Sequence, residues 1–153
     1  MKLTNEQVLA LIPQQKPFRF IDQLIELNKD GAIGEYTFRE DEFFYPGHFP
    51  GNPVTPGVIL IETLCQTGLV ALGIYLLALE FEQEEVKKIV TLFTDSAVEF
   101  SNMVKPGDTV RVSAEKVYWR RRKLKSKVTM TLADGTVVAR GTVAGMGVSR
   151  DQL

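Results

Sequence analysis

The residues best suited to chemistry begin with His48, the sole histidine of the chain. It lies in residues 46–57, where more than half of the residues are proline or glycine. Helices and central strands do not tolerate this density, so the segment is predicted to be an irregular loop, stiffened because each proline fixes a backbone angle. An isolated loop histidine is often structural. Imidazole, however, titrates near neutrality and can both take and give a proton, so His48 is the candidate base.

A carboxyl group among apolar neighbours is the second candidate. Residues 59–61 and 64–65 around Glu62 are all apolar. Such surroundings raise the pKa of a carboxyl group, so that it stays protonated and acts as an acid. Gln66 lies one helical turn later and is predicted either to orient Glu62 or to bond to a nearby backbone group. A glutamate that points to solvent is the alternative interpretation of Glu62.

The start of the helix that carries Glu62 supplies a third element. Pro56 is predicted at the first helical position, and Gly57 has no side chain to block its own N–H. Free amides at a helix N-terminus stabilise developing negative charge. Glu62 is about 7.5 Å farther along the axis, and helical side chains lean back toward the N-terminus. Together the groups suggest that His48 removes a proton from the carbon next to a carbonyl group. The Gly57 N–H would stabilise the negative charge on the carbonyl oxygen, and Glu62 would give a proton to the β-substituent as it leaves.

The elements that position these groups follow from hydrophobic patterning. A short helix is predicted to open with a capping box of Thr4 and Gln7 and to end at Pro13. The predicted strands cover residues 18–27 and 33–38, part of 88–100, and 109–119, 124–132 and 136–146. Asp134-Gly135 is a strong hairpin turn. The order favours one α+β domain over residues 1–153, in which an antiparallel sheet curls around a long helix.

That long helix corresponds to an almost continuously apolar run from Val58 to Leu79. Its length would also suit a membrane span. Glu62 inside the run would cost roughly 2.5–3.5 kcal/mol on insertion scales, and no lysine or arginine lies near either end to anchor a span. The run is therefore predicted to be the buried axis of a globular protein, without a membrane span.

Composition limits the class of protein. The 153 residues carry 18 basic and 19 acidic side chains, a formal net charge of −1, which disfavours general binding of nucleic acid. The N-terminal residues lack the apolar run of a signal peptide. Cys65 is the sole cysteine, so no internal disulfide is expected and nothing indicates a structural zinc site. These features predict a cytoplasmic protein.

The loop and helix together resemble a known signature. The matching positions are 47–51 (Gly-His-Phe-Pro-Gly), 53 (Pro), 56–58 (Pro-Gly-Val), 62 (Glu) and 66 (Gln). They are similar to the signature of bacterial (3R)-hydroxyacyl-acyl-carrier-protein dehydratases. The glutamate on the helix matches one branch of the family, whereas the dehydratase-isomerase branch has aspartate there. The likeness continues at residues 11–13, 17–18, 22, 43–44 and 104–108 and near Arg120, and it covers nearly the whole chain.

This resemblance implies a hot-dog fold, a long central helix wrapped by an antiparallel sheet. It also implies a homodimer or higher homo-oligomer with joined sheets, in which His48 faces Glu62 of the partner subunit. The family converts (3R)-hydroxyacyl thioesters to trans-2-enoyl thioesters without metal or redox cofactor, in fatty acid or related polyene synthesis. The acyl chain would lie in an apolar tunnel, and the phosphopantetheine arm would reach the acyl-carrier protein outside.

Some positions depart from the family pattern. Thr63 stands where alanine is usual, Cys65 where another small residue is common, and residues 99–103 lack the basic side chains often found there. The basic stretch 120–127 is either an exposed hairpin or a patch for an acidic partner such as a carrier protein. Two alternative functions stay open: a thioesterase in which Glu62 activates water, and a non-catalytic binder of acyl thioesters.

Overall fold

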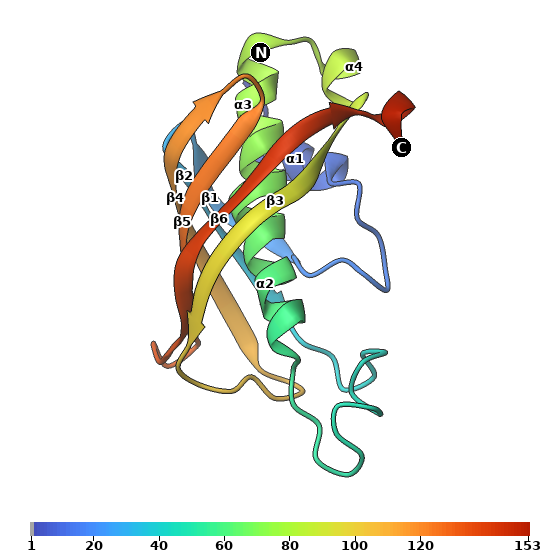
Figure 1. Cartoon of the computed structure of the whole chain (residues 1–153), viewed down its shortest axis with the longest axis vertical. Helices are drawn as coiled ribbons and strands as arrows, with labels where there is room; N and C mark the ends of the chain where they lie inside the picture. Colours follow the sequence, from blue (N-terminus) through green and yellow to red (C-terminus); the bar gives the residue numbers. More distant parts are fainter. Residues whose placement is uncertain (1) are drawn as a thin grey trace.

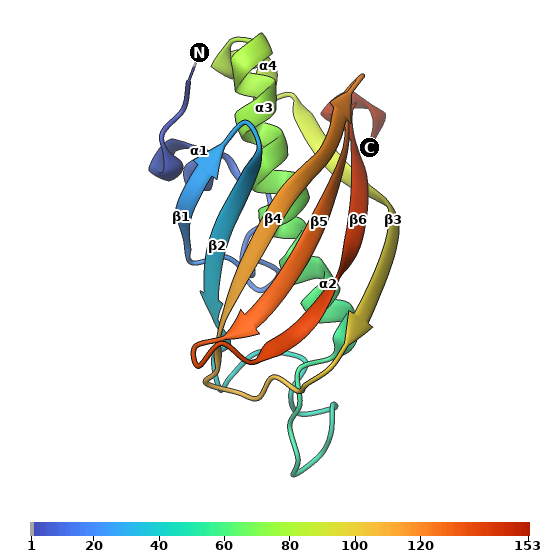
Figure 2. The same cartoon turned by 90° about the vertical axis from the view of Figure 1, so that its left-hand side faces the viewer.

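The computed structural model describes residues 2–153, and within them six strands form one antiparallel sheet in the order β1-β2-β4-β5-β6-β3. The strands are β1 (Gln23–Asn28), β2 (Gly31–Thr37), β3 (Ile89–Phe100), β4 (Thr109–Arg120), β5 (Lys123–Leu132) and β6 (Val137–Ser149). Figure 2 shows the strands side by side, curled across the long helix behind them. The predicted arrangement of sheet and helix is confirmed.

The helical segments of the same residues are α1 (Asn5–Leu11), α2 (Gly57–Cys65), η1 (Gln66–Ala71), α3 (Leu72–Glu80), α4 (Gln83–Val86) and η2 (Arg150–Gln152). The capping box predicted for the first helix is present, because Gln7 N donates to Thr4 Oγ1 and Thr4 N donates to Gln7 Oε1. Segments α2, η1 and α3 follow one another without a break and form the long helix in the centre of Figure 1. The short segments α4 and η2 fall outside the predicted elements, although η2 begins at a capping box formed by Ser149 and Gln152.

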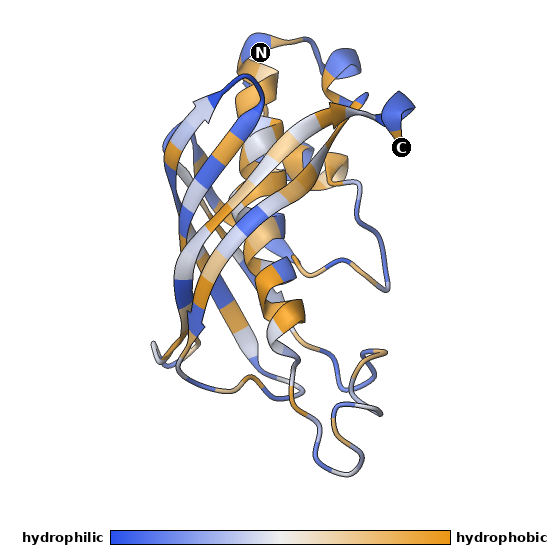
Figure 3. Cartoon of the chain, viewed as in Figure 1, coloured by the Kyte–Doolittle hydropathy of each residue, from blue (hydrophilic) through white to orange (hydrophobic). Residues whose placement is uncertain are grey.

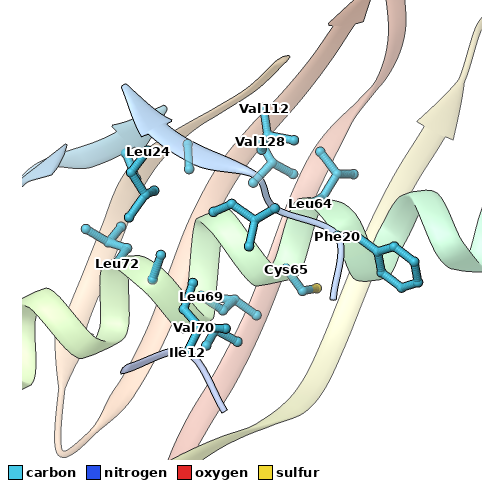
Figure 4. Packing of buried hydrophobic residues seen from close by; sticks show 14 of the residues in the cluster. Ile12, Phe20, Leu24, Leu64, Cys65, Leu69, Val70, Leu72, Val112 and Val128 are labelled. Carbon is cyan, nitrogen blue, oxygen red and sulfur yellow. The ribbon is translucent and has the colours of Figure 1, made fainter. Parts of the chain in front are cut away.

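The long helix is the core of the fold. By length and composition alone it could cross a membrane, yet 78% of its most apolar 18-residue window is buried inside the protein. Residues 63–78 are buried without exception, and Figure 3 shows the helix as a largely apolar rod behind strands of mixed hydropathy. In Figure 4, Leu64, Leu69 and Leu72 lie in one cluster with Val112 and Val128 of the sheet. The sheet thus removes the apolar helix surface from water, which is the main stabilising contribution.

The middle of the helix approaches the sheet very closely. Gln66–Ala71 is a π-helical segment, and Gly68 O accepts a hydrogen bond of 2.7 Å from the buried Ser126 hydroxyl of β5. A methyl group on Gly68 would lie 2.9 Å from Val128 Cγ1, which is too short for a carbon–carbon contact. A larger residue at this position would force the helix or Val128 to shift. Such π segments are frequent at functional sites, and this one begins at Gln66.

Several predicted strand boundaries are wrong: β2 begins at Gly31 rather than at residue 33, and β6 continues to Ser149 rather than ending at residue 146. Two further differences have a cause in tertiary hydrogen bonding. The strand expected from residue 18 begins only at Gln23, because Phe18 O and Phe20 N bond to the Gln66 side chain instead of to a neighbouring strand. The second strand ends at Thr37, and Phe38 N donates to Asp108 O in the turn before β4. The backbone groups are satisfied in both places, but by partners distant in sequence.

Strand β3 lies at one edge of the sheet. Within residues 2–153 it pairs with β6 alone, so its other edge is open. It is 12 residues long, and Leu92, Phe93 and Phe100 are 47%, 43% and 45% exposed. A long, apolar open edge is a ready surface for pairing with another strand.

Candidate active site

His48 lies in the loop that extends beyond the start of α2 in Figure 1. Its N–H donates to Tyr45 O at 3.2 Å, and its carbonyl accepts from Val54 N at 2.9 Å. The ring atom Nδ1 lies 2.8 Å from Val54 O. A carbonyl oxygen only accepts hydrogen bonds, so Nδ1 must carry the proton, and Nε2 of the neutral ring keeps its lone pair. The ring is thus held in the tautomer that a general base requires.

The loop around the imidazole is ordered by its own contacts as well as by its prolines. Phe49 N donates to Asn52 O at 3.2 Å and Asn52 N donates to Phe49 O at 2.8 Å. The Phe49 ring stacks on the imidazole with centroids 4.1 Å apart and planes 24° apart. One face of the imidazole is therefore covered by an aromatic ring that is itself 54% exposed.

Glu62 is partly buried on α2, as expected for a carboxyl group among apolar neighbours. Burial raises the pKa of this carboxyl, and the hydrogen bond from Gln66 opposes the rise. Because burial is the larger effect, Glu62 keeps its proton to higher pH than an ordinary glutamate. The side chain is suited to donate a proton to a leaving group.

Gln66 fixes the geometry of that carboxyl. Its side chain is fully buried, with Oε1 accepting from Phe20 N at 2.7 Å and Nε2 donating to Phe18 O at 3.0 Å. The remaining N–H of Nε2 donates to Glu62 Oε2 at 2.8 Å. Both interpretations of Gln66 therefore hold together, because it bonds to backbone groups and orients Glu62. Since Oε2 accepts, the acidic proton of Glu62 resides on Oε1.

The start of α2 differs in one detail from the prediction. Pro56 is the N-cap residue, with an extended ψ of 140°, and the helix begins at Gly57. Pro56 O accepts from Ile59 N and Leu60 N, whereas Gly57 N–H donates to no other group in the described part of the chain. A free amide at the positive end of a helix is able to donate a hydrogen bond to an oxyanion.

An aromatic ring that the sequence did not single out adjoins this donor. A methyl group on Gly57 would lie 3.4 Å from Phe100 Cζ, so the last residue of β3 packs against the first residue of α2. Val54 was also missed as a functional residue, because its contribution is a backbone carbonyl and leaves no signal in residue type. Phe100 is found only when β3 and α2 are placed side by side.

The chain gathers the loop and the first turns of α2 at one end of the molecule (Figure 1). His48 and Glu62 nevertheless have separate polar partners, and no hydrogen bond or ion pair within residues 2–153 joins them. In the same residues, no group of three or more histidine, cysteine, aspartate or glutamate side chains has the arrangement of a metal site. Burial and the charge of Glu62 raise the pKa of the Cys65 thiol, which keeps it protonated.

Comparison with known proteins agrees with this geometry. A family model described as a FabA-like domain matches residues 12–144. Among solved structures, the dehydratase heterocomplex ApeI:P from Xenorhabdus doucetiae is similar with a TM-score of 0.76 and 14% identity, covering 98% of this chain and 95% of that one. The thioesterase HI1161 from Haemophilus influenzae has a TM-score of 0.67 and 12% identity, covering 97% and 93%. These distant likenesses establish the hot-dog fold.

Closer relatives define the family within that fold. A protein of Chloroflexus aggregans named 3-hydroxyacyl-(acyl-carrier-protein) dehydratase FabZ is 37% identical over 133 residues, covering 86% of this chain and 88% of its own. A protein of Acetivibrio thermocellus with the same name is 38% identical over 143 residues, covering 92% of each chain. The chain belongs to this family of 3-hydroxyacyl-(acyl-carrier-protein) dehydratases, which are hydro-lyases.

Proposed function

We propose that this protein dehydrates (3R)-hydroxyacyl thioesters, carried on an acyl-carrier protein, to trans-2-enoyl thioesters, with His48 as base and Glu62 as acid. The observation that carries the assignment is the bond from His48 Nδ1 to Val54 O, because it leaves Nε2 as a proton acceptor. The pathway is fatty acid synthesis or a related polyene pathway in the cytoplasm, with residues 1–153 acting as one domain. Burial of the long helix in the fold supports this location.

In the reaction, His48 Nε2 takes the proton from the carbon next to the thioester carbonyl. Negative charge that develops on the thioester oxygen is stabilised by Gly57 N–H at the start of α2. Glu62 Oε1 gives its proton to the 3-hydroxyl group, the carbon–oxygen bond breaks, and water leaves as the carbon–carbon double bond forms. The carboxylate left behind keeps the hydrogen bond from Gln66, which stabilises its charge.

We further propose that the active unit is a homodimer joined along the open edge of β3. The 12-residue edge and the exposed apolar Leu92, Phe93 and Phe100 support this. The separate polar partners of His48 and Glu62 within one chain support it as well. In such a dimer His48 faces Glu62 of the partner subunit, and the acyl chain lies in an apolar tunnel between the subunits.

The basic stretch 120–127 is proposed as the contact for the acidic carrier protein. Arg121 and Arg122 form the exposed two-residue turn between β4 and β5. In Figures 1 and 2 this turn lies at the opposite end of the molecule from the His48 loop of the same chain. Antiparallel pairing of β3 with its copy inverts the long axis, so the turn of one subunit comes toward the loop end of the other.

The test follows hydration of a short trans-2-enoyl thioester by its loss of absorbance, with purified wild type and variants. His48→Ala and Glu62→Gln are each expected to lower turnover by about 10²–10⁴-fold. Glu26→Gln, an exposed glutamate on β1, is the matched control and keeps wild-type turnover. Wild-type turnover in His48→Ala would refute the assignment of the base, and release of free thiol without hydration would indicate a thioesterase.

Subunit mixing tests the shared site. Combining His48→Ala chains with Glu62→Gln chains creates, in each mixed dimer, one site that holds both native side chains. With random mixing, about one quarter of wild-type turnover is expected to return. If both side chains of a site came from one chain, the mixture would be as inactive as its components.

A further inference from the structure

The loop that carries His48 is closed at its base by a bond between two buried side chains. Tyr45 and Thr55 are 4% and 3% exposed, and their hydroxyl oxygens lie 2.7 Å apart. We infer that this pair, the Tyr45–Thr55 clasp, is a positioning device for the imidazole of His48. The inference rests on the proposed function, in which His48 is the base.

The loop has few other means of holding its position. Residues 49–53 are all exposed, and they project beyond the body of the protein in Figure 1. Proline fixes local backbone angles, but it does not fix where a loop sits relative to the helix behind it. A catalytic group that is misplaced by about 1 Å loses much of its effect, so the base of this loop must be held by something rigid.

Each half of the clasp is anchored in the protein body. Thr55 N donates to Val104 O at 2.9 Å, and Val104, in the segment that connects β3 to β4 along the chain, is fully buried. Tyr45 packs edge-on against Phe44 with ring centroids 4.7 Å apart, and Phe44 in turn packs edge-on against the buried rings of Phe20 and Phe38. The bond between the two hydroxyls therefore links two separately fixed points.

Two groups support His48, the carbonyl of Tyr45 and the backbone of Val54, and each is directly connected to one half of the clasp. The carbonyl of Tyr45 accepts from His48 N at 3.2 Å, and Val54, which precedes Thr55, bonds to His48 through its own N–H and C=O. A change in the separation of Tyr45 and Thr55 moves one support relative to the other. Because Val54 O also holds Nδ1, the same change tilts the ring.

The hydroxyl groups, and not merely the volume of the side chains, carry this effect. Burial raises the pKa of Tyr45 to about 12, so the phenol stays protonated throughout any practical assay. Phenylalanine and valine fill almost the same space without the bond. Removing one hydroxyl leaves the other buried without its partner, whereas removing both leaves no unpaired group at this point. This difference separates positioning from stability.

The experiment compares Tyr45→Phe, Thr55→Val, the double variant and Thr55→Ser in the hydration assay, well below each melting temperature. Each single variant is expected to lower kcat about three- to tenfold with KM little changed. In the double variant the melting temperature recovers while kcat stays low, and Thr55→Ser, which keeps a hydroxyl, retains kcat. Ser126→Ala removes a buried hydroxyl bond of 2.7 Å remote from the loop, so it lowers stability without lowering kcat.

An independent measurement uses the fact that His48 is the sole histidine. In protein without a polyhistidine tag, the ¹⁵N-labelled imidazole gives one set of NMR signals. We expect sharp signals of an Nδ1–H ring in the wild type and broadened or shifted signals in Tyr45→Phe. Ser126→Ala should leave the signals as they are in the wild type.

The outcomes separate this inference from the proposed function. If His48→Ala is inactive but Tyr45→Phe keeps wild-type kcat and unchanged imidazole signals, the clasp has no positioning role. If kcat of the double variant recovers together with its melting temperature, the clasp acts on stability alone and the inference is again wrong. If His48→Ala keeps wild-type turnover, the proposed base is wrong, and the imidazole signals still decide whether the clasp orders the ring.

Discussion

Replacing Gln66 by leucine tests the hydrogen-bond network behind Glu62. Leucine has a similar size and suits a helix, so the change removes the amide without creating a large cavity. Three groups lose their partner: Phe20 N, Phe18 O and Glu62 Oε2. The backbone of residues 18–20 then has no link to the long helix at this point.

The expected loss of stability can be summed from these three groups. An orphaned buried N–H, as at Phe20, costs about 1–3 kcal/mol. Phe18 O and Glu62 Oε2 are only part-buried, so each is assigned about 0.5–1.5 kcal/mol. The free energy of unfolding is thus expected to fall by about 2–6 kcal/mol, a large part of the stability of a domain of this size.

The assay is urea unfolding followed by the fluorescence of Trp119, the sole tryptophan. The protein concentration is held constant, since subunit association shifts apparent stability by mass action. Gln23→Leu is the control, because the Gln23 amide on β1 donates to Glu35 Oε1 on β2 in a bond that is exposed to solvent. That variant is expected to change the free energy of unfolding by less than about 0.5 kcal/mol.

The same substitution has a kinetic consequence of defined sign. Without the Gln66 donor nothing opposes the effect of burial, so the pKa of Glu62 rises further. In the dehydration direction, where Glu62 must carry its proton, the fall in turnover that accompanies ionisation of the acid then moves to higher pH. A loss of stability below about 1 kcal/mol, or a shift of this limb to lower pH, would refute the account of Gln66.

Three further predictions concern single positions. The folded-state pKa of Glu62 is raised, so its contribution to stability is full below the ordinary value of 4.5 and is lost as pH rises through the raised value. In urea unfolding, the free energy of unfolding of Glu62→Gln should therefore rise relative to that of the wild type as pH increases over that window. A difference that does not change with pH would contradict this. Arg121 has a φ of 51°, so Arg121→Gly should raise the free energy of unfolding by up to about 1 kcal/mol and the melting temperature with it, and a lower melting temperature would refute the strain. Gly68→Ala should lower the free energy of unfolding by about 1–3 kcal/mol, and Val128→Ala should recover part of this loss in a double-mutant cycle. If the effects of the two substitutions simply add, the two positions do not clash.

The sequence by itself was sufficient for the features that depend on local chemistry. Proline and glycine in residues 46–57 exclude helix and strand whatever surrounds them, so the rigid loop could be predicted. An apolar run from Val58 to Leu79 with a carboxyl group inside it indicates a buried helix, and turn residues such as Asp134-Gly135 mark the hairpins. The motif around His48 and Glu62 then identified the family that the comparisons confirmed.

The tertiary structure decided everything that depends on a partner distant in the chain. The first strand begins at Gln23 because Gln66, more than forty residues later, takes the backbone groups of Phe18 and Phe20. The tautomer of His48 depends on the carbonyl of Val54, a group that every residue type possesses and that no sequence pattern reveals. Hydrogen bonds of this kind are set by where the backbone comes to lie, and that position is a property of the folded chain as a whole.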